Sequence, residues 1–182
     1  MTVLFDADDV AMDIQRVAND VYDIVRHTPP KDVVFVGILT NGVFLAKRVR
    51  AALAKRQFVI PDAVMALDVT LYRDDHARSK KTYLTVESAI QTVGVDGKHV
   101  VLFDDVLCTA RTVRAALNAI FDYGRPEKVH FSVLYDRGHR QVPIQPNVVA
   151  RHLDVPMDLR VNTVFFEVMG EDLVKAEPFP AE

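Results

Sequence analysis

The stretch that decides the fold is His99-Val-Val-Leu-Phe103-Asp104-Asp105-Val-Leu-Cys-Thr109-Ala-Arg-Thr112. The apolar run up to Phe103 is typical of a strand that is buried on both faces of a sheet. Two acids and several hydroxyl residues follow it. A helix is then predicted from about Arg111 to Tyr123, with Gly124 as its C-cap. This order of strand, polar turn and helix indicates an α/β domain with a parallel sheet.

The preceding part of the chain has the same order. The apolar run Val33–Leu39 predicts another buried strand, which ends in the turn Thr40-Asn41-Gly42. Apolar residues recur at helical spacing between Asp9 and His27, which predicts an amphipathic helix. We also expect a helix at about 43–56 and strands at about 64–70, 129–135, 148 and 161–168. The predicted fold class is α/β, with a mostly parallel central sheet, flanking helices and right-handed crossovers.

Length and composition limit the class of protein. The chain has 182 residues, which predicts a single domain over residues 1–182. Hydrophobic residues make up 49% and charged residues 26%, which is ordinary for a folded protein and excludes a disordered chain. The longest apolar run is too short to cross a membrane, and the acidic N-terminus does not resemble a signal peptide. With a single cysteine, Cys108, no internal disulfide can form, so we expect a cytoplasmic protein without a membrane partner.

The net charge is −3, so the protein as a whole does not attract nucleic acid. The charge is nevertheless uneven, because residues 43–57 carry five basic residues and no acid, and residues 137–160 are rich in Arg and His. Two local basic surfaces are therefore compatible with the sequence. On charge alone, the simpler interpretation is that these stretches form ordinary solvated faces.

Polar residues cluster where the predicted strands end, at 40–42, 68–73, 104–112 and 136–140. Because ligands of open α/β sheets bind beyond the carboxyl ends of the strands, one composite site is predicted. Asp104 and Asp105 can bind a diol or a metal ion, whereas Thr109 and Thr112 stand at a helix N-terminus, which suits a phosphate. The chain lacks a P-loop motif. The pattern favours a ribose 5-phosphate ligand, and the alternative is that the two acids only cap the following helix.

The block from Val100 to Thr112 resembles the phosphoribosyl pyrophosphate (PRPP) motif of type I phosphoribosyltransferases. The match is closer to one subfamily, the PyrR family of pyrimidine operon regulators that are also uracil phosphoribosyltransferases. Its supporting blocks are Leu67 to Asp75, Arg111 to Ala116, Gly124-Arg-Pro126 and Val133 to Arg140. The resemblance covers most of residues 8–168. It implies the type I phosphoribosyltransferase fold with a flexible lid loop, at about 71–97, and a small hood.

The resemblance implies a role for each part of the site. Asp104 and Asp105 would bind the ribose hydroxyls of PRPP, and Thr40-Asn41-Gly42 would form the pyrophosphate loop. Tyr72 and Arg73 would belong to the lid, with Arg73 counted among the catalytic residues. Mg²⁺ would bind through PRPP rather than through direct protein ligands. The 5-phosphate would lie in the loop that contains Val106, Leu107, Cys108, Thr109, Ala110, Arg111 and Thr112.

The implied reaction joins uracil to PRPP and gives UMP and pyrophosphate, in a homodimer or a higher homo-oligomer. The resemblance also places Arg137, His139, Arg140 and Arg151 beside the nucleobase pocket and on a surface that binds a messenger RNA leader. Alternatively, these four residues serve only the nucleobase site and contacts between subunits. Two other functions stay open at this point: a phosphoribosyltransferase for another base, and a non-catalytic RNA-binding regulator that senses nucleotides at the PRPP site.

The chain departs from the subfamily pattern at three positions of the site. Asn41 replaces an arginine, and the loss of a charge-assisted bond would weaken PRPP binding by roughly 1 kcal/mol. Ala110 replaces a glycine, which would cost about 1 kcal/mol if the position requires a positive φ. Cys108 stands where a tyrosine is common, and we expect it to fill space rather than to act as a nucleophile.

Overall fold

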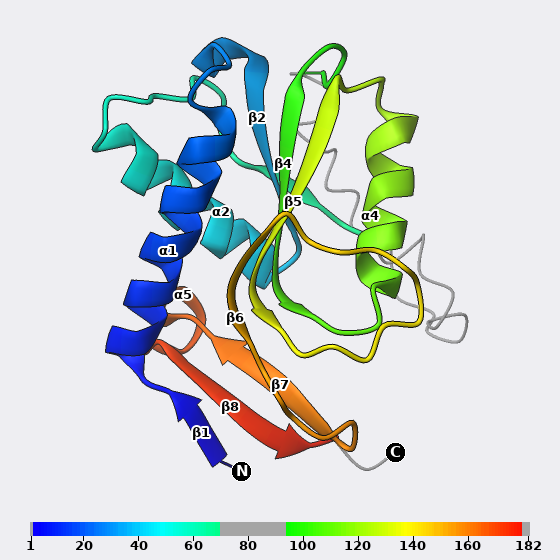
Figure 1. Cartoon of the computed structure of the whole chain (residues 1–182). Helices are drawn as coiled ribbons and strands as arrows, with labels where there is room; N and C mark the ends of the chain where they lie inside the picture. Colours follow the sequence, from blue (N-terminus) through cyan, green and yellow to red (C-terminus); the bar gives the residue numbers. More distant parts are fainter. Residues whose placement is uncertain (1, 70–93, 180–182) are drawn as a thin grey trace.

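The computed structural model describes residues 2–69 and 94–179. Most of the predicted lid, including Tyr72 and Arg73, lies outside these residues, so its role stays a prediction. The central sheet has five strands in the order β3-β2-β4-β5-β6, and every neighbouring pair is parallel. The prediction of a parallel α/β sheet is therefore confirmed (Figure 1). The strands are β2 (Val33–Ile38), β3 (Met65–Leu67), β4 (His99–Leu107), β5 (Lys128–Asp136) and β6 (Val148–His152).

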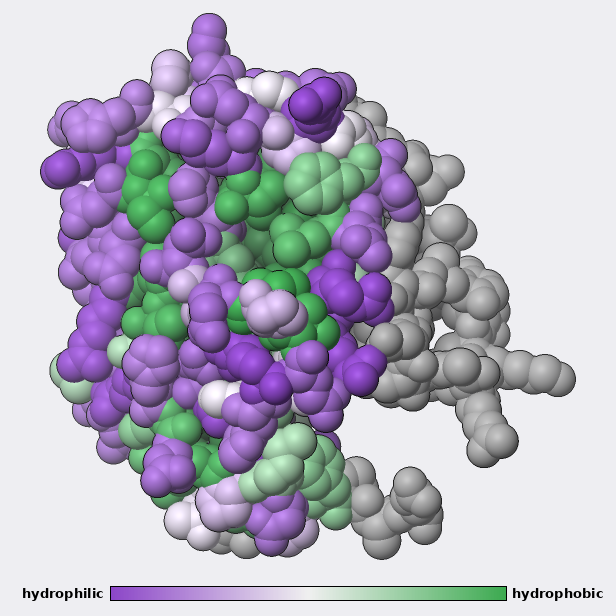
Figure 2. All heavy atoms as spheres, turned by 45° about the vertical axis from the view of Figure 1, so that its right-hand side comes forward, coloured by the Kyte–Doolittle hydropathy of each residue, from purple (hydrophilic) through white to green (hydrophobic). Residues whose placement is uncertain are grey.

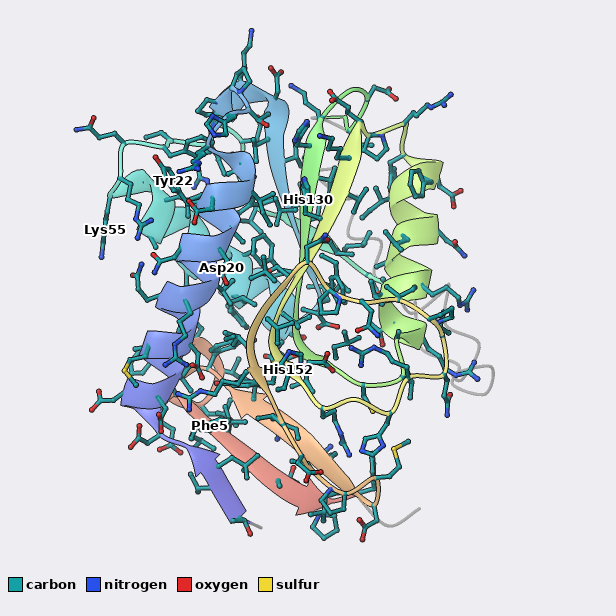
Figure 3. The ribbon with its side chains drawn as sticks, viewed as in Figure 1. Phe5, Asp20, Tyr22, Lys55, His130 and His152 are labelled. Atoms are coloured by element: carbon teal, nitrogen blue, oxygen red, sulfur yellow. The ribbon has the colours of Figure 1, made fainter. Side chains whose placement is uncertain are left out.

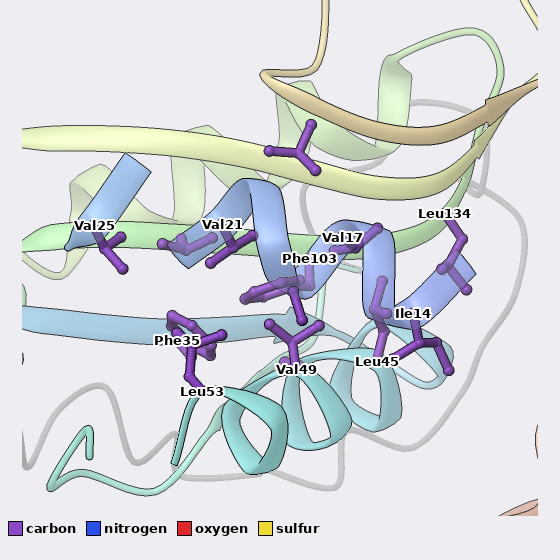
Figure 4. Packing of buried hydrophobic residues seen from close by; sticks show 14 of the residues in the cluster. Ile14, Val17, Val21, Val25, Phe35, Leu45, Val49, Leu53, Phe103 and Leu134 are labelled. Carbon is purple, nitrogen blue, oxygen red and sulfur yellow. The ribbon is translucent and has the colours of Figure 1, made fainter. Parts of the chain in front are cut away.

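Helices cover both faces of this sheet. α1 (Ala7–Val25) and α2 (Asn41–Ala54) lie on one face, and α4 (Arg111–Asp122) lies on the other (Figure 1). Successive residues of a strand point to opposite faces, so each strand contributes to two cores. Phe35 and Phe103 pack under α1 and α2 (Figure 4), whereas Val34 and Leu102 pack under α4. This arrangement explains why β2 and the residues from Val100 to Phe103 of β4 are apolar at successive positions.

A second, smaller sheet lies beyond the carboxyl ends of the central strands (Figure 1). It is antiparallel, with the order β1-β8-β7, and we call it the hood together with the short helix α5. Its elements are β1 (Thr2–Phe5), β7 (Leu159–Val164), α5 (Phe166–Met169) and β8 (Leu173–Pro178). The sequence predicted a strand over residues 161–168, but β7 ends at Val164. The N-terminal strand β1 was not predicted, because it depends on pairing with the distant β8.

Arg48 of α2 fastens the hood to the core. Its guanidinium donates hydrogen bonds to the carboxylates of Glu167 and Asp172, the latter at 2.6 and 2.8 Å. It also lies 4.8 Å from the centre of the Phe165 ring, which is a cation–π distance. The hydrogen bond from Arg48 lowers the pKa of the Glu167 carboxyl. The position of the hood over the strand ends is therefore held by charged groups as well as by apolar packing.

Several predicted boundaries are wrong by a few residues. β4 does not stop at Phe103 but continues to Leu107, because Asp104 and Val106 still pair with β5. α2 begins at Asn41 rather than after the turn, and α1 begins at Ala7, where Asp6 caps it by accepting a bond from the Asp9 amide at 3.0 Å.

No helix among the described residues is long and apolar enough to span a membrane. The face shown in Figure 2 is mostly hydrophilic, with apolar residues gathered in small areas.

Candidate PRPP site at the carboxyl ends of the strands

The parallel strands bring the predicted site residues to one edge of the central sheet. Asn41 begins α2 directly after β2, Asp104 and Asp105 lie in the last part of β4, and Asp136 ends β5. The carboxyl ends of the central strands lie toward the hood (Figure 1). Segments separated by more than sixty residues in the sequence meet here, since Asn41 hydrogen-bonds to Asp105. The prediction of one composite site at the strand ends agrees with this geometry.

A cavity of about 320 Å³ lies between this edge and the hood. Its size is within the range of small-molecule sites. The side that belongs to the central sheet includes Asp104, the loop 106–110, Thr112 and the buried Arg137. The opposite side comes from the hood and the chain that leads into and out of it: Met157, Arg160, Val161 and Phe179. No sequence pattern indicated this second wall, which is built by residues of β7 and the segments before β7 and after β8.

The loop before α4 has the geometry of an anion site. Ala110 occupies the N-cap position of α4 with φ of 69°, a left-handed conformation that costs a residue other than glycine about 1–2 kcal/mol. The positive φ expected at this position is therefore present. Ala110 offers no capping side chain, although the Thr109 hydroxyl accepts a weak bond from the Arg111 amide at 3.4 Å. Amides at the start of a helix that lack strong protein acceptors are suited to a phosphate.

The two acids of β4 are held in different ways. Asp104 accepts a bond from the Asp105 amide at 3.0 Å, while the Asp105 carboxylate accepts one from the Asn41 side-chain amide at 2.8 Å. Both residues are half-buried, and Asp104 lines the cavity. The alternative that these acids cap α4 is wrong, because Ala110 is the N-cap residue of that helix. Asp104 is placed to meet a diol in the cavity, whereas Asp105 is not among the cavity-lining residues and bonds to Asn41.

Close backbone contact positions the start of α2 against the strands. A Cβ atom on Gly42 would lie 2.3 Å from the carbonyl oxygen of Phe103, and one on Gly37 would lie 2.4 Å from the Cα atom of Val43. Only glycine permits this approach. The peptide bond between Leu39 and Thr40 is cis. The Thr40-Asn41-Gly42 segment therefore lies directly beside Asp104 and Asp105, where a pyrophosphate loop is expected.

The segment after β5 packs beside the loop that precedes α4. Arg140 donates bonds to the Asp136 carboxylate at 2.6 Å, to the Cys108 carbonyl at 2.9 Å and to the Ile144 carbonyl at 3.0 Å. Burial opposes ionisation of Asp136, but the hydrogen bonds from Arg140 and from the Gly138 amide lower its pKa. Arg140 thus joins the end of β5 to the loop before α4, and its guanidinium is occupied by protein acceptors.

Arg137 and His139 differ in how they relate to the cavity. Arg137 is only 5% exposed, lines the cavity, and donates one bond to the Pro156 carbonyl at 2.7 Å. Its Nε atom is buried and has no hydrogen-bond partner among the described residues. The His139 ring bonds to the Val155 carbonyl at 3.1 Å. Arg137 is therefore the residue of this segment that is best placed to meet a ligand.

The structure does not bring Arg151 to this site. The guanidinium of Arg151 bonds to the fully buried carboxylate of Asp13 at 2.7 and 2.8 Å and to Asp9 at 3.0 Å. It also lies 4.5 Å from the centre of the Phe5 ring. Burial, together with the adjacent Asp13 carboxylate, raises the pKa of Tyr135, whose hydroxyl donates to Asp13. Arg151 belongs to a network that joins β6 to α1, and its role toward a nucleobase or RNA stays a prediction.

Two features of the site lie beyond what the sequence alone could predict. The first is the hood wall of the cavity. The second is the bridge from Asn41 to Asp105 and to the Thr163 carbonyl, since the three residues are far apart in the chain. Among the described residues, no group of three or more His, Cys, Asp or Glu side chains is arranged to hold a metal ion.

Comparisons with known proteins agree with this fold. The family described as "Phosphoribosyl transferase domain" matches residues 4–159, which defines the class of protein. The ternary substrates complex of a hypoxanthine phosphoribosyltransferase variant from Trypanosoma cruzi shares the fold, with a TM-score of 0.72 at 21% identity over 97% of this chain and 95% of that one.

Relatives with higher sequence identity identify the family within this class of transferases. The chain is 41% identical over 171 residues to the bifunctional protein PyrR 1 of Lactiplantibacillus plantarum, which covers 92% of this chain and 94% of that protein. It is 40% identical over 176 residues to the bifunctional protein PyrR of Syntrophobacter fumaroxidans. That alignment covers 96% of this chain and 92% of the relative. The chain therefore belongs to the PyrR family of phosphoribosyltransferases.

Proposed function

We propose that this protein transfers the 5-phosphoribosyl group of PRPP to uracil and releases pyrophosphate. The observation that carries the proposal is the single cavity that contains Asp104, the amide-rich start of α4 and the buried Arg137. These groups suit, in turn, a sugar diol, a phosphate and a nucleobase carbonyl. Membership of the PyrR family supports the same assignment.

Each part of the site has a role in this proposal. Asp104 and Asp105 hold the ribose hydroxyls, and the residues from Thr109 to Thr112 hold the 5-phosphate through backbone amides and hydroxyls. The pyrophosphate lies against Thr40-Asn41-Gly42. Bond breaking at the ribose is helped by orientation of the reactants and by fixed dipoles around the developing charge, without a covalent enzyme intermediate.

Magnesium fits the donor set of the site. Half-buried carboxylates stand beside the expected pyrophosphate loop, and Mg²⁺ commonly binds through one or two carboxylates and substrate phosphates while it keeps several waters. When bound with PRPP, the ion would neutralise the charge of the leaving pyrophosphate. The proposal needs no cluster of direct protein ligands.

Arg137 supports a base that presents a carbonyl oxygen. An arginine side chain has only hydrogen-bond donors, and Arg137 lines the cavity, so it suits a ligand that presents acceptors there. Uracil offers two carbonyl oxygens, whereas adenine presents an amino group and no carbonyl. Hypoxanthine and guanine also carry a carbonyl, so a phosphoribosyltransferase for one of these bases is the main alternative.

The test is pyrophosphate release from PRPP and Mg²⁺ with a panel of bases. We expect uracil to support pyrophosphate release with the highest kcat/KM. Hypoxanthine and guanine should give much lower values of kcat/KM, and adenine should support no release. A purine that exceeds uracil would replace the proposed substrate. If no base supports release although PRPP binds, the protein is a non-catalytic nucleotide sensor.

We also propose a second function, which is binding of a pyrimidine operon leader RNA under control of uridine nucleotides. The support is that the relatives are named bifunctional proteins. Arg140 and Arg151 are occupied by protein acceptors, so the exposed Lys47 and Lys55 of the basic stretch 43–57 are better placed to meet phosphates. Lys55 lies at the outer side of α2 (Figure 3).

Filter binding of the host's leader RNA at two salt concentrations tests this second function. Specific binding should exceed binding to a scrambled RNA, and Lys55→Ala should reduce the salt slope by about one unit if Lys55 contacts a phosphate. Equal and weak binding of both RNAs at physiological salt would refute the regulatory function and leave the transferase unaffected. We propose a homo-oligomer as the working form, which light scattering of the purified protein tests.

A further inference from the structure

The side-chain amide of Asn41 makes two hydrogen bonds inside the protein. Its Nδ2 atom donates to the Asp105 carboxylate at 2.8 Å and to the carbonyl oxygen of Thr163 at 2.9 Å. An asparagine amide nitrogen carries two hydrogens, so both donors of Asn41 are in use. The remaining group of the side chain is a carbonyl oxygen, which can only accept a hydrogen bond. A pyrophosphate, which offers acceptors, therefore finds no donor on this side chain.

These two bonds connect three separate elements. Asn41 begins α2, Asp105 belongs to β4, and Thr163 is a buried residue of the hood strand β7. The start of α2 packs closely on β4, because Gly42 has no Cβ atom, and one built there would lie 2.3 Å from the carbonyl oxygen of Phe103. The same β7 contributes Arg160 and Val161 to the cavity. The bridge thus links a ribose-binding carboxylate to the wall that faces the nucleobase.

We propose that Asn41 is a positioning residue. It fixes the Asp105 carboxylate for the ribose hydroxyls and holds β7 at a fixed distance from the start of α2. It is not a pyrophosphate ligand, although it lies in the pyrophosphate loop. The inference rests on the proposed function, because the ribose in question is that of PRPP. Asn41 acts through Asp105 and Thr163, so its loss affects binding of the sugar rather than of the leaving group.

The experiment compares three ligands in the presence of Mg²⁺: PRPP, ribose 5-phosphate and inorganic pyrophosphate. Their affinities are measured by calorimetry for the natural protein and for Asn41→Ala. The matched control is Asn162→Ala, because Asn162 is a neighbouring amide of β7 that bonds to Glu177 instead of Asp105. Unfolding midpoints of all variants are measured alongside.

The expected result is selective. Asn41→Ala should weaken the binding of PRPP and of ribose 5-phosphate by a similar factor, roughly five- to tenfold for one lost hydrogen bond, and leave the affinity for pyrophosphate within about twofold. Asn162→Ala should leave all three affinities unchanged. In an Asp105→Asn background, Asn41→Ala should cause little further loss of ribose 5-phosphate affinity, since the two residues act as a unit.

Other outcomes overturn the proposal. A lower affinity for pyrophosphate with an unchanged affinity for ribose 5-phosphate would show that Asn41 is a pyrophosphate ligand. No change in any of the three affinities would show that the bridge has no part in binding. An equal loss for all three ligands with a lowered unfolding midpoint would assign Asn41 a purely structural role. If the natural protein binds neither PRPP nor ribose 5-phosphate, the proposed function itself fails, whereas the outcomes above reject only the role of Asn41.

Discussion

Replacing Arg151 by alanine should destabilise the fold rather than remove an RNA contact. The Asp13 carboxylate is fully buried, and Arg151 neutralises it through bonds of 2.7 and 2.8 Å. In the variant, Asp13 keeps only the Tyr135 hydroxyl at 3.2 Å and the half-exposed Arg16 at 3.1 Å. A buried carboxylate would then be left without its main cation.

The size of the effect follows from the burial of this pair. Breaking a buried ion pair by removal of one partner costs about 3–5 kcal/mol. Because the Arg151 side chain is 25% exposed, solvent screening lowers the expected loss to about 2–4 kcal/mol. For a domain of this length, 1 kcal/mol corresponds to roughly 2–4 °C, so the unfolding midpoint should fall by about 4–16 °C.

Urea unfolding followed by circular dichroism measures this loss, and Arg26→Ala is the matched control. Arg26 pairs with Asp23 at the end of the same helix at 3.5 Å, but both side chains are at least half exposed. The control should change the free energy of unfolding by less than about 0.5 kcal/mol. The reasoning would be refuted if Arg151→Ala were as stable as the control while binding of the leader RNA disappeared.

Three further predictions concern single side chains. Ala110→Gly should stabilise the fold by about 0.5 kcal/mol, because relief of the left-handed conformation slightly exceeds the added entropy of the unfolded chain; a clear loss in denaturant unfolding would contradict this. Burial, together with the charges of His99 and Lys128, lowers the pKa of His130 below 6.5. The unfolded chain then binds more protons, so stability should fall as the pH drops through about 6.5, and His130→Leu should flatten that slope in unfolding titrations. Arg137→Met should raise the KM for uracil more than the KM for PRPP, and steady-state kinetics with equal effects on both would argue against its contact with the base.

Most of the central fold could be predicted from local sequence. Val33 to Leu39 and Val100 to Phe103 are apolar at successive positions, which is typical of strands buried on both faces. The polar residues that follow them mark the ligand edge. The boundaries were less accurate, because pairing with β5 carries β4 through Asp104 and Asp105, where the apolar pattern has already stopped.

The hood and the inner contacts of the site could not be predicted in the same way. β1 pairs with β8 at the far end of the chain, and no local pattern signals such a pairing. Arginines also look alike in a sequence, whether they serve a ligand or the fold. The structure separates Arg137, which lines the cavity, from Arg151, which balances the buried Asp13 carboxylate beside Phe5 (Figure 3 labels Phe5).

The most direct test of the account is UMP formation from uracil and PRPP with Mg²⁺, measured for the natural protein and for Asp105→Asn. The account predicts turnover by the natural protein and a loss of at least about a hundredfold in the variant, because electrostatic contacts at a reacting sugar typically contribute this much. The unfolding midpoint of the variant should stay close to that of the natural protein. Equal turnover by the two proteins would contradict the assignment of the ribose site to the end of β4, and so would an absence of UMP from the natural protein.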